Sequence, residues 1–204
     1  MKKLLTIGFT GILAVAALAV ESDPSNTVGF ISQTLGTGFS TFSACPIGLA
    51  ADAPAADYIA GQGIPGDVIY KHNGTAWSGY AWTADWTGLT FDYNSAFLFK
   101  NNSGAAESLV IAGDVIPVGT DLAMGTFASG TYAAWGNPLP MDIDLDVDDC
   151  TLAADGFASG DKIFKHNGTA WSGYMYNGTT YGGLVLDAGE TFLVKIDGAH
   201  ADVS

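Results

Sequence analysis

Short runs of β-branched and aromatic residues recur along the whole chain, and Gly, Asn and Pro separate them. Runs of this length and composition predict strands, because helices need longer segments with an apolar residue every three or four positions. The Ala- and Asp-rich segment 48–60 is where one short helix fits best. The expected strands are residues 27–35, 39–47, 68–71, 96–100, 107–118, 132–139 and 190–196.

One stretch of the sequence occurs twice. Residues 66–80 are GDVIYKHNGTAWSGY, and residues 160–174 are GDKIFKHNGTAWSGY. Self-similarity of this kind indicates related structural units. We therefore predict an all-β fold with two related small β-sandwich-like or barrel-like units in tandem and at most one short helix per unit. The two copies differ only at Val68/Lys162 and Tyr70/Phe164.

Each copy predicts a β-hairpin. Asn73-Gly74 and Asn167-Gly168 each lie between two strand-like runs, which is a strong hairpin signal. A type I′ turn is expected, because it needs φ > 0 at both central positions and Asn and Gly tolerate that. A hairpin alone is barely stable in water, so each one should belong to a larger sheet.

Residues 1–19 have the composition of a secretory signal peptide. Two lysines precede an apolar run, and Ala17-Leu18-Ala19 fits the small-x-small cleavage pattern. The sequence after this segment has no second run long enough to span a bilayer. We expect a secreted or cell-surface protein whose mature part has no membrane span. The two β-units are expected at residues 20–118 and 119–204.

The two predicted units end differently. A strand at residues 107–118 continues unit one, and unit two has no counterpart to it. An open sheet edge exposes unpaired backbone groups, and three arrangements would account for it. The strand at residues 27–35 covers this edge within its own chain, the same strand covers it in a neighbouring molecule, or unit two simply ends at a short edge.

Composition and charge narrow the choice of partners. Hydrophobic residues make up 48% of the chain and charged residues 14%, and the formal net charge is −14. A chain with so few lysines and arginines does not bind nucleic acid through its phosphates, and an anionic membrane surface would repel it. An uncharged surface rich in Gly, Ala and Thr would be a solubility risk in a monomer, and it suits a subunit buried in an assembly.

The sequence offers little material for catalysis. It contains neither a Gly-x-Ser-x-Gly nucleophile elbow nor a His-Glu-x-x-His pair. Its histidines are His72, His166 and His200, and the first two adjoin the Asn-Gly turns, which predicts hairpin tips rather than catalytic bases. The few glutamates leave little choice for a glycosidase pair. We therefore do not expect an enzyme.

An acidic run at residues 141–149 is the strongest polar feature. Asp alternates there with Ile, Leu and Val, which would place the carboxylates on one face of an extended segment. Such a row of like charges repels itself, and calcium, which prefers carboxylate oxygens, would relieve the repulsion. The alternative is a solvated strand face that discourages edge pairing. The candidate calcium ligands are Asp142, Asp144, Asp146 and Asp148.

The tryptophans and tyrosines fall into two groups. Trp77 and Trp171 occupy the same position in the two hairpins, which favours a place in the core. The aromatic residues of the divergent loops after the hairpins are better candidates for stacking on a sugar or on a neighbouring subunit. These residues are Trp82, Trp86, Tyr176 and Tyr181.

The chain has two cysteines, Cys45 and Cys150. In an exported chain an even number of cysteines favours a disulfide. Such a bridge would tie unit one to unit two, and the loop-entropy model gives it roughly 4.7 kcal/mol. The alternative is two buried free thiols.

Two motifs of unit two resemble those of a known group of proteins. One follows a strand and ends in Asn-Pro-Leu, and the other is Gly-Glu-x-Phe-x-Val-Lys. With the hairpin between them, the chain resembles tandem-unit secreted bacterial proteins of unassigned function, related to β-domains of the GWNLIS…PGxGYWV pattern. This resemblance implies an all-β fold and carries no catalytic residues. Unit one departs from the motifs, because Cys45 replaces the Asn and Asn94-Ser95-Ala96 replaces Gly-Glu. The matching residues are Tyr132, Asn137, Pro138, Leu139, Gly189, Glu190, Phe192, Val194 and Lys195.

Together these features predict an exported, non-enzymatic structural subunit. It would assemble with itself into a filament, sheath or surface layer, through addition of a strand between subunits. The alternative is a carbohydrate-binding or adhesive module that binds a surface glycan through its loop aromatics. No cofactor is expected apart from structural calcium, and neither nucleic acid nor a membrane is an expected partner.

Overall fold

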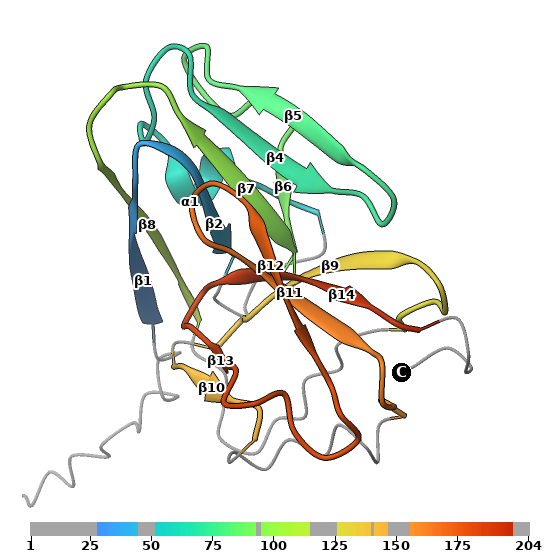
Figure 1. The fold of residues 1–204 in the computed structure, drawn as a ribbon. Helices are drawn as coiled ribbons and strands as arrows, with labels where there is room; N and C mark the ends of the chain where they lie inside the picture. Colours follow the sequence, from blue (N-terminus) through green and yellow to red (C-terminus); the bar gives the residue numbers. More distant parts are fainter. Residues whose placement is uncertain are drawn as a thin grey trace, which may run out of the picture.

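A computed structural model describes residues 28–44, 52–92, 95–114, 126–139, 141–146 and 156–197 (Figure 1). Within them the chain consists of antiparallel strands and one helix, the four-residue α1 (Ala56–Ile59). The predicted all-β class is therefore confirmed. The predicted signal peptide at residues 1–19 lies outside the described residues, as do Cys45, Asp148 and Cys150.

The first sheet has four strands, β2 (Gly38–Ser43), β4 (Val68–His72), β5 (Trp77–Ala81) and β7 (Ala96–Asn101). Their order is β2-β7-β4-β5, and every pair is antiparallel. Side chains alternate across β7 as the sequence predicts, with Phe97 and Phe99 buried and Lys100 exposed.

The second sheet has the strands β9 (Tyr132–Gly136), β11 (Lys162–His166), β12 (Trp171–Met175) and β14 (Thr191–Lys195). Their order is β12-β11-β14-β9, again with antiparallel pairs. Phe192 and Val194 of β14 are buried in the positions that Phe97 and Phe99 take in β7. The two sheets thus have the same strand order.

Two short strand pairs accompany the sheets. They are β3 (Ala53–Pro54) with β6 (Thr90–Phe91), and β10 (Ile143–Asp144) with β13 (Val185–Leu186). In chain order β3 lies between β2 and β4, and β10 lies between β9 and β11. Both halves of the molecule therefore follow the same succession of sheet strand, short strand, hairpin, short strand and sheet strand.

A separate two-stranded sheet, the β1–β8 ribbon, has no counterpart in the described second half. β1 (Val28–Leu35) pairs along its full length with β8 (Glu107–Asp114), and the two run side by side in Figure 1. The idea that the strand at residues 27–35 closes the second unit within its own chain is therefore wrong. The physical reason is a shared core, because Leu35, Leu109 and Ile111 turn their side chains into the core of the first half.

Each sheet has its own core. One cluster of buried side chains belongs to the first half with the ribbon, and another belongs to the second half. The central aromatic pairs correspond, since Phe42 stacks on Phe97 with ring centroids 4.9 Å apart and Trp135 packs on Phe192 at 5.1 Å. Burial of these rings stabilises each half.

A buried aspartate precedes each hairpin. Asp67 accepts hydrogen bonds of 2.9 Å from two backbone N–H groups, one three residues earlier and one just after β7. Asp161 does the same at 2.8 and 2.7 Å, the second donor lying just after β14. Both residues are fully buried, so these bonds satisfy their carboxylates and fix the start of each hairpin.

The hairpin loops are not the predicted type I′ turns. Four residues connect β4 to β5, and only Gly74, with φ 96°, has a positive φ among them. The side-chain oxygen of Asn73 accepts hydrogen bonds from the N–H groups of Thr75 and Ala76 at 3.1 and 2.9 Å. The asparagine therefore closes the loop as an acceptor and does not adopt a left-handed conformation. Asn167 repeats this arrangement in the second hairpin.

The two sheets meet where β2 and β9 end. A Cβ at Gly136 would collide with Ser43 and would lie 2.7 Å from the carbonyl oxygen of Ser95, so only glycine fits there. Ser43 Oγ donates to the carbonyl oxygen of Asn137 at 2.6 Å, and the buried Thr191 hydroxyl bonds to the backbone of β2 and β7. This junction joins the halves through buried hydrogen bonds.

Candidate functional site

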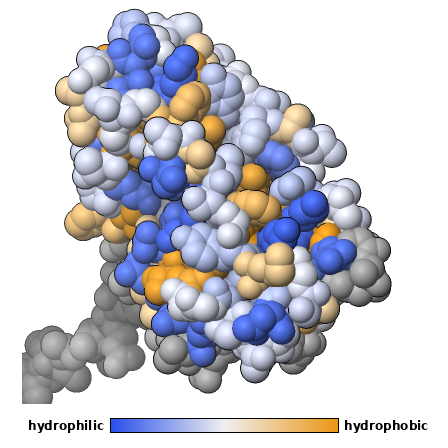
Figure 2. Space-filling view, viewed as in Figure 1, coloured by the Kyte–Doolittle hydropathy of each residue, from blue (hydrophilic) through white to orange (hydrophobic). Residues whose placement is uncertain are grey.

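The β1–β8 ribbon has one buried face and one exposed face. Leu35, Leu109 and Ile111 alternate onto the buried face and are 1–3% exposed. On the opposite face Phe30 is 72% exposed and Val110 is 37% exposed. At positions 30–34 and 108–112 that face has no charged side chain, although the net charge of the chain is −14. Elsewhere the visible face in Figure 2 is mostly hydrophilic, with small hydrophobic patches between the polar residues. The exposed residues of this ribbon face between 30 and 112 are Phe30, Ser32, Thr34, Ser108, Val110 and Ala112.

Gln62 caps the outer edge of β8 at one position, Val110. Its Nε2 donates to the carbonyl oxygen of Val110 at 2.8 Å, and its Oε1 accepts from the N–H of Val110 at 2.7 Å. The side-chain amide makes the two hydrogen bonds that a neighbouring strand would make. Sequence reasoning missed this residue, because a glutamine between two glycines in a loop gives no signal of such a role.

The outer edge of β1 has no such cap. Ser32 lies opposite Val110 and, like it, directs its N–H and C=O away from the ribbon, because bonded and non-bonded pairs alternate in an antiparallel ladder. The same holds for Phe30 and Thr34, two positions away on either side. Within the described residues these backbone groups have no hydrogen-bonding partner. The edge therefore offers a row of donors and acceptors to another strand.

Gln33 anchors β1 to the second half of the molecule. Its Nε2 donates to the carbonyl oxygens of Ala188 and Gly189 at 3.1 and 2.5 Å. Gly189 has a φ of +67°, and a Cβ there would collide with the Gln33 side chain. The ribbon thus contacts both halves, and the open edge belongs to a strand that is held in place.

The four loop aromatics that were candidates for a ligand surface are mostly core residues. Trp86, Tyr176 and Tyr181 are 1%, 4% and 4% exposed, and only Trp82 is half-buried. Trp86 packs edge-on against Phe99 of β7, with ring centroids 6.1 Å apart. Burial also raises the pKa of the Tyr181 hydroxyl. These three buried rings offer no face to a sugar or a subunit, because the loops that carry them complete the cores.

Trp77 and Trp171, expected in the core, instead meet at the tips of the two hairpins and belong to neither core cluster. Their rings stack with centroids 6.3 Å apart and planes at 23°. His72 lies edge-on to Trp77 at 5.0 Å, and His166 lies edge-on to Trp171 at 5.1 Å. The copied sequence thus forms a contact between equivalent residues of the two halves.

The two hairpin histidines act as acceptors in this contact. The N–H groups of Gly74 and Gly168 donate to Nδ1 of His72 and His166 at 3.2 and 3.1 Å. Burial lowers the pKa of both imidazoles. These neutral rings therefore stabilise the hairpin tips.

The described part of the acidic run, residues 141–146, does not form the predicted extended face. Within it the strand is limited to β10, and a turn follows at residues 145–146. The described carboxylates are acceptors for separate backbone segments, and no group of three or more metal-ligating side chains occurs in the part of the chain that the structure describes. Asp142 accepts from the N–H of Ala188 at 2.8 Å, Asp144 from that of Asp146 at 3.0 Å, and Asp146 from those of Tyr181 and Gly183.

Comparisons with protein-family models, curated proteins and solved structures gave no significant match. No helix in the described ranges is long and apolar enough to cross a membrane. The open edge of β1, beside the exposed Phe30 and Val110, is therefore the candidate site that the geometry itself indicates.

Proposed function

We propose that the chain is an exported structural subunit that assembles with copies of itself by pairing strands along the outer edge of β1. One contrast carries this proposal. Gln62 caps β8 at Val110, whereas the backbone groups of Phe30, Ser32 and Thr34 are left unpaired in the described chain. Natural proteins protect exposed edges, because unpaired backbone groups act as templates for another chain. An edge without any cap, beside one that is capped at its middle, favours a partner strand.

A second copy of β1 is the partner strand that this edge fits. Two β1 strands related by a twofold axis would pair antiparallel and would join two ribbons into one four-stranded sheet. Charge favours this contact, because copies of a chain with net charge −14 repel each other and the exposed positions at residues 30–34 and 108–112 carry no charge. The Ser and Thr side chains of that face also pair favourably across strands.

Growth beyond a dimer needs a second contact. A twofold contact uses the same edge of both copies and closes on itself. The outer strands β5 and β12 of the two sheets are the further edges that a filament, sheath or surface layer would use. The subunit would then have one contact through the ribbon and another through a sheet.

We further propose that the two halves are tandem copies of one β-unit, each with an Asn-Gly hairpin. The equal strand order of the two sheets supports this, as do the matching short strand pairs and the equal hydrogen bonds of Asp67 and Asp161. Export rests on the sequence of residues 1–19. The secreted tandem β-domain proteins that the chain resembles have the same organisation.

The edge is tested with two proline variants. Ser32→Pro removes an N–H that points away from β8, so it removes a donor from the open edge and leaves the ladder with β8 intact. Ser108→Pro is the matched control, because it removes an outward N–H from the β8 edge instead. Both variants lose the same hydrogen bond, the 3.1 Å contact between Ser32 Oγ and Ser108 Oγ.

Light scattering coupled to size exclusion measures the oligomeric state of each variant. Electron microscopy of the concentrated protein shows whether larger assemblies form. The wild type and Ser108→Pro should associate as the concentration rises, and Ser32→Pro should remain monomeric. A wild type that stays monomeric at its highest soluble concentration would overturn the proposal. So would a Ser32→Pro variant that associates as readily as the wild type.

A further inference from the structure

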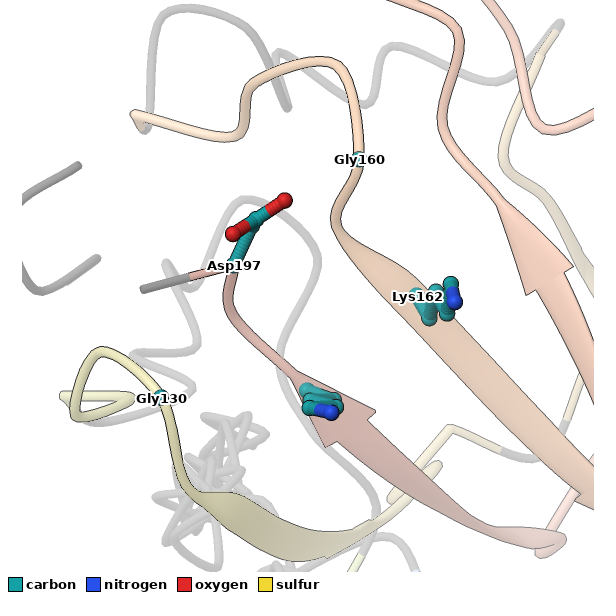
Figure 3. Close-up of a pocket in the computed structure, with 5 residues that line it drawn as sticks. Gly130, Gly160, Lys162 and Asp197 are labelled. Atoms are coloured by element: carbon teal, nitrogen blue, oxygen red, sulfur yellow. The ribbon is translucent and has the colours of Figure 1, made fainter. Parts of the chain in front are cut away.

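A cavity of about 210 Å³ opens at the end of the second sheet opposite its hairpin tip. The start of β11, the end of β14 and the turn before β9 surround it (Figure 3). Its volume is below the roughly 300–1,000 Å³ that is common for drug-sized ligands, so its ligand would be small. The lining residues are Gly130, Gly160, Lys162, Lys195 and Asp197.

Two lysines lie side by side in the lining of this cavity. Lys162 and Lys195 are directly opposite in the register of β11 and β14, and like charges so placed repel each other. Lys195 Nζ lies over the ring of Tyr132, 5.1 Å from its centroid, and Lys162 forms no ion pair with any residue that the structure describes. By contrast, Lys71 and Lys165 contact carboxylates at 2.9 and 2.8 Å. Two lysines at one place stand out in a chain with 21 acidic and 7 basic residues.

The first sheet has the same frame without the second lysine. There Val68 faces Lys100, and Asn102 takes the position of Asp197. The N–H groups of Asn102 and Asp197 both donate to the buried aspartate that precedes the hairpin of their half. The change from Val68 to Lys162 is one of the two differences between the copied stretches. The second half therefore keeps the backbone and changes the charges at this place.

Gly160 leaves the space that Asp197 uses. Its φ is +110°, and a Cβ there would lie 2.6 Å from Asp197 Oδ2. Figure 3 shows the Asp197 carboxylate directed toward Gly160, at the side of the cavity away from Lys162. The cavity thus has two ammonium groups from the strands and one carboxylate beyond them.

We propose that this cavity binds a small hydroxylated carboxylate of the sugar-acid class. The carboxylate of the ligand lies between Lys162 and Lys195, where it forms charge-assisted hydrogen bonds and relieves their repulsion. A hydroxyl group of the ligand donates to the Asp197 carboxylate, which has several acceptor positions. Two positive charges and one negative charge suit a monoanion, and Asp197 repels ligands with a second anionic group. This inference does not depend on assembly through β1.

The test is a calorimetric titration of the full mature protein with D-glucuronate, D-glucose and sulfate as probes. Glucuronate should bind saturably and more weakly as salt is added, glucose should not bind, and sulfate should bind less tightly than glucuronate. Lys162→Val should weaken glucuronate binding by about tenfold, because a charge-assisted hydrogen bond is lost. Valine is the residue of the first sheet at this position, so the variant should fold. Lys100→Val is the matched control and should bind as the wild type does.

Several results would overturn the inference. One is that Lys162→Val binds glucuronate as tightly as the wild type does. Another is that the wild type binds glucose as tightly as glucuronate. A third is that sulfate binds as tightly as glucuronate, which would indicate a general anion site. If glucuronate fails to bind and Lys162→Val abolishes self-association, the cavity instead holds a carboxylate of a second copy. Repeating the titration with Ser32→Pro separates the two proposals, because this variant should bind glucuronate whether or not the β1 edge mediates assembly.

Discussion

The two halves of the molecule have the same order of strands in their sheets. They differ in the elements beside the sheets and at the sheet ends. In both halves a buried aspartate fixes the start of the hairpin, and in both a histidine and a tryptophan form its tip. The first half also carries the β1–β8 ribbon with its open edge. The second half has the lysine cavity in place of the Val68–Lys100 pair. The copied residues thus maintain the frame, and the candidate interactions lie where the halves diverge.

Removing either buried aspartate should have the largest effect. Asp67→Ala and Asp161→Ala each leave two backbone N–H groups without their acceptor. Each change should lower the free energy of unfolding by about 4 kcal/mol. Urea denaturation of the two variants measures both losses. If only one of the two variants lost stability clearly, the two aspartates would not have equivalent roles in the two halves.

The junction between the sheets should be nearly as sensitive. Gly136→Ala places a methyl group against Ser43 and the backbone of Ser95, and this overpacking should lower the free energy of unfolding by about 3 kcal/mol. Gly36→Ala is the control, because its Cβ would meet only Ser40 Oγ, at 3.8 Å. Thermal unfolding of both variants gives the comparison, and equal stability of the two would contradict the tight junction.

The histidines at the hairpin tips should make both halves sensitive to acid. Burial lowers the pKa of His72 and His166 from the ordinary value of 6.5. The unfolded chain therefore binds protons at a pH where the folded chain does not, and stability is lost as the pH falls through about 6.5. Urea unfolding at about pH 7.5 and about pH 5.5 should show a larger loss for the wild type than for the double variant His72→Gln/His166→Gln. An equal loss in both proteins would contradict this origin of the acid sensitivity.

The smallest effect should come from the lysine cavity. Without a ligand, Lys162→Val removes the repulsion with Lys195 and should raise the free energy of unfolding by about 0.5 kcal/mol. The reverse change in the first half, Val68→Lys, should lower it by a similar amount. A destabilised Lys162→Val variant would mean that the lysine already has a compensating partner.

Alternation along the chain made many strands predictable. Residues 96–100 were expected as a strand, and β7 covers them. Residues 27–35 and 107–118 likewise contain β1 and β8. Local patterns succeed here because the two-residue period of a strand does not depend on its partner.

Partners and burial were not predictable in the same way. The alternation in residues 27–35 is the same whether the strand pairs with β8 or with another edge, so the sequence could not identify the ribbon. Trp86 lies in a loop and is buried, whereas Trp77 lies in a strand and meets Trp171 at the hairpin tips. Gln62 caps an edge through a contact with a residue far away in sequence. Such outcomes depend on which elements meet, and no local pattern encodes that.

Amide hydrogen exchange at low and high protein concentration tests the open edge most directly. The N–H groups of Phe30, Ser32 and Thr34 should exchange quickly in dilute solution and slowly at high concentration, because a second copy then pairs with them. Those of Ile31 and Gln33 point toward β8 and should exchange slowly at both concentrations. Fast exchange of the three edge amides at every concentration would contradict assembly through β1.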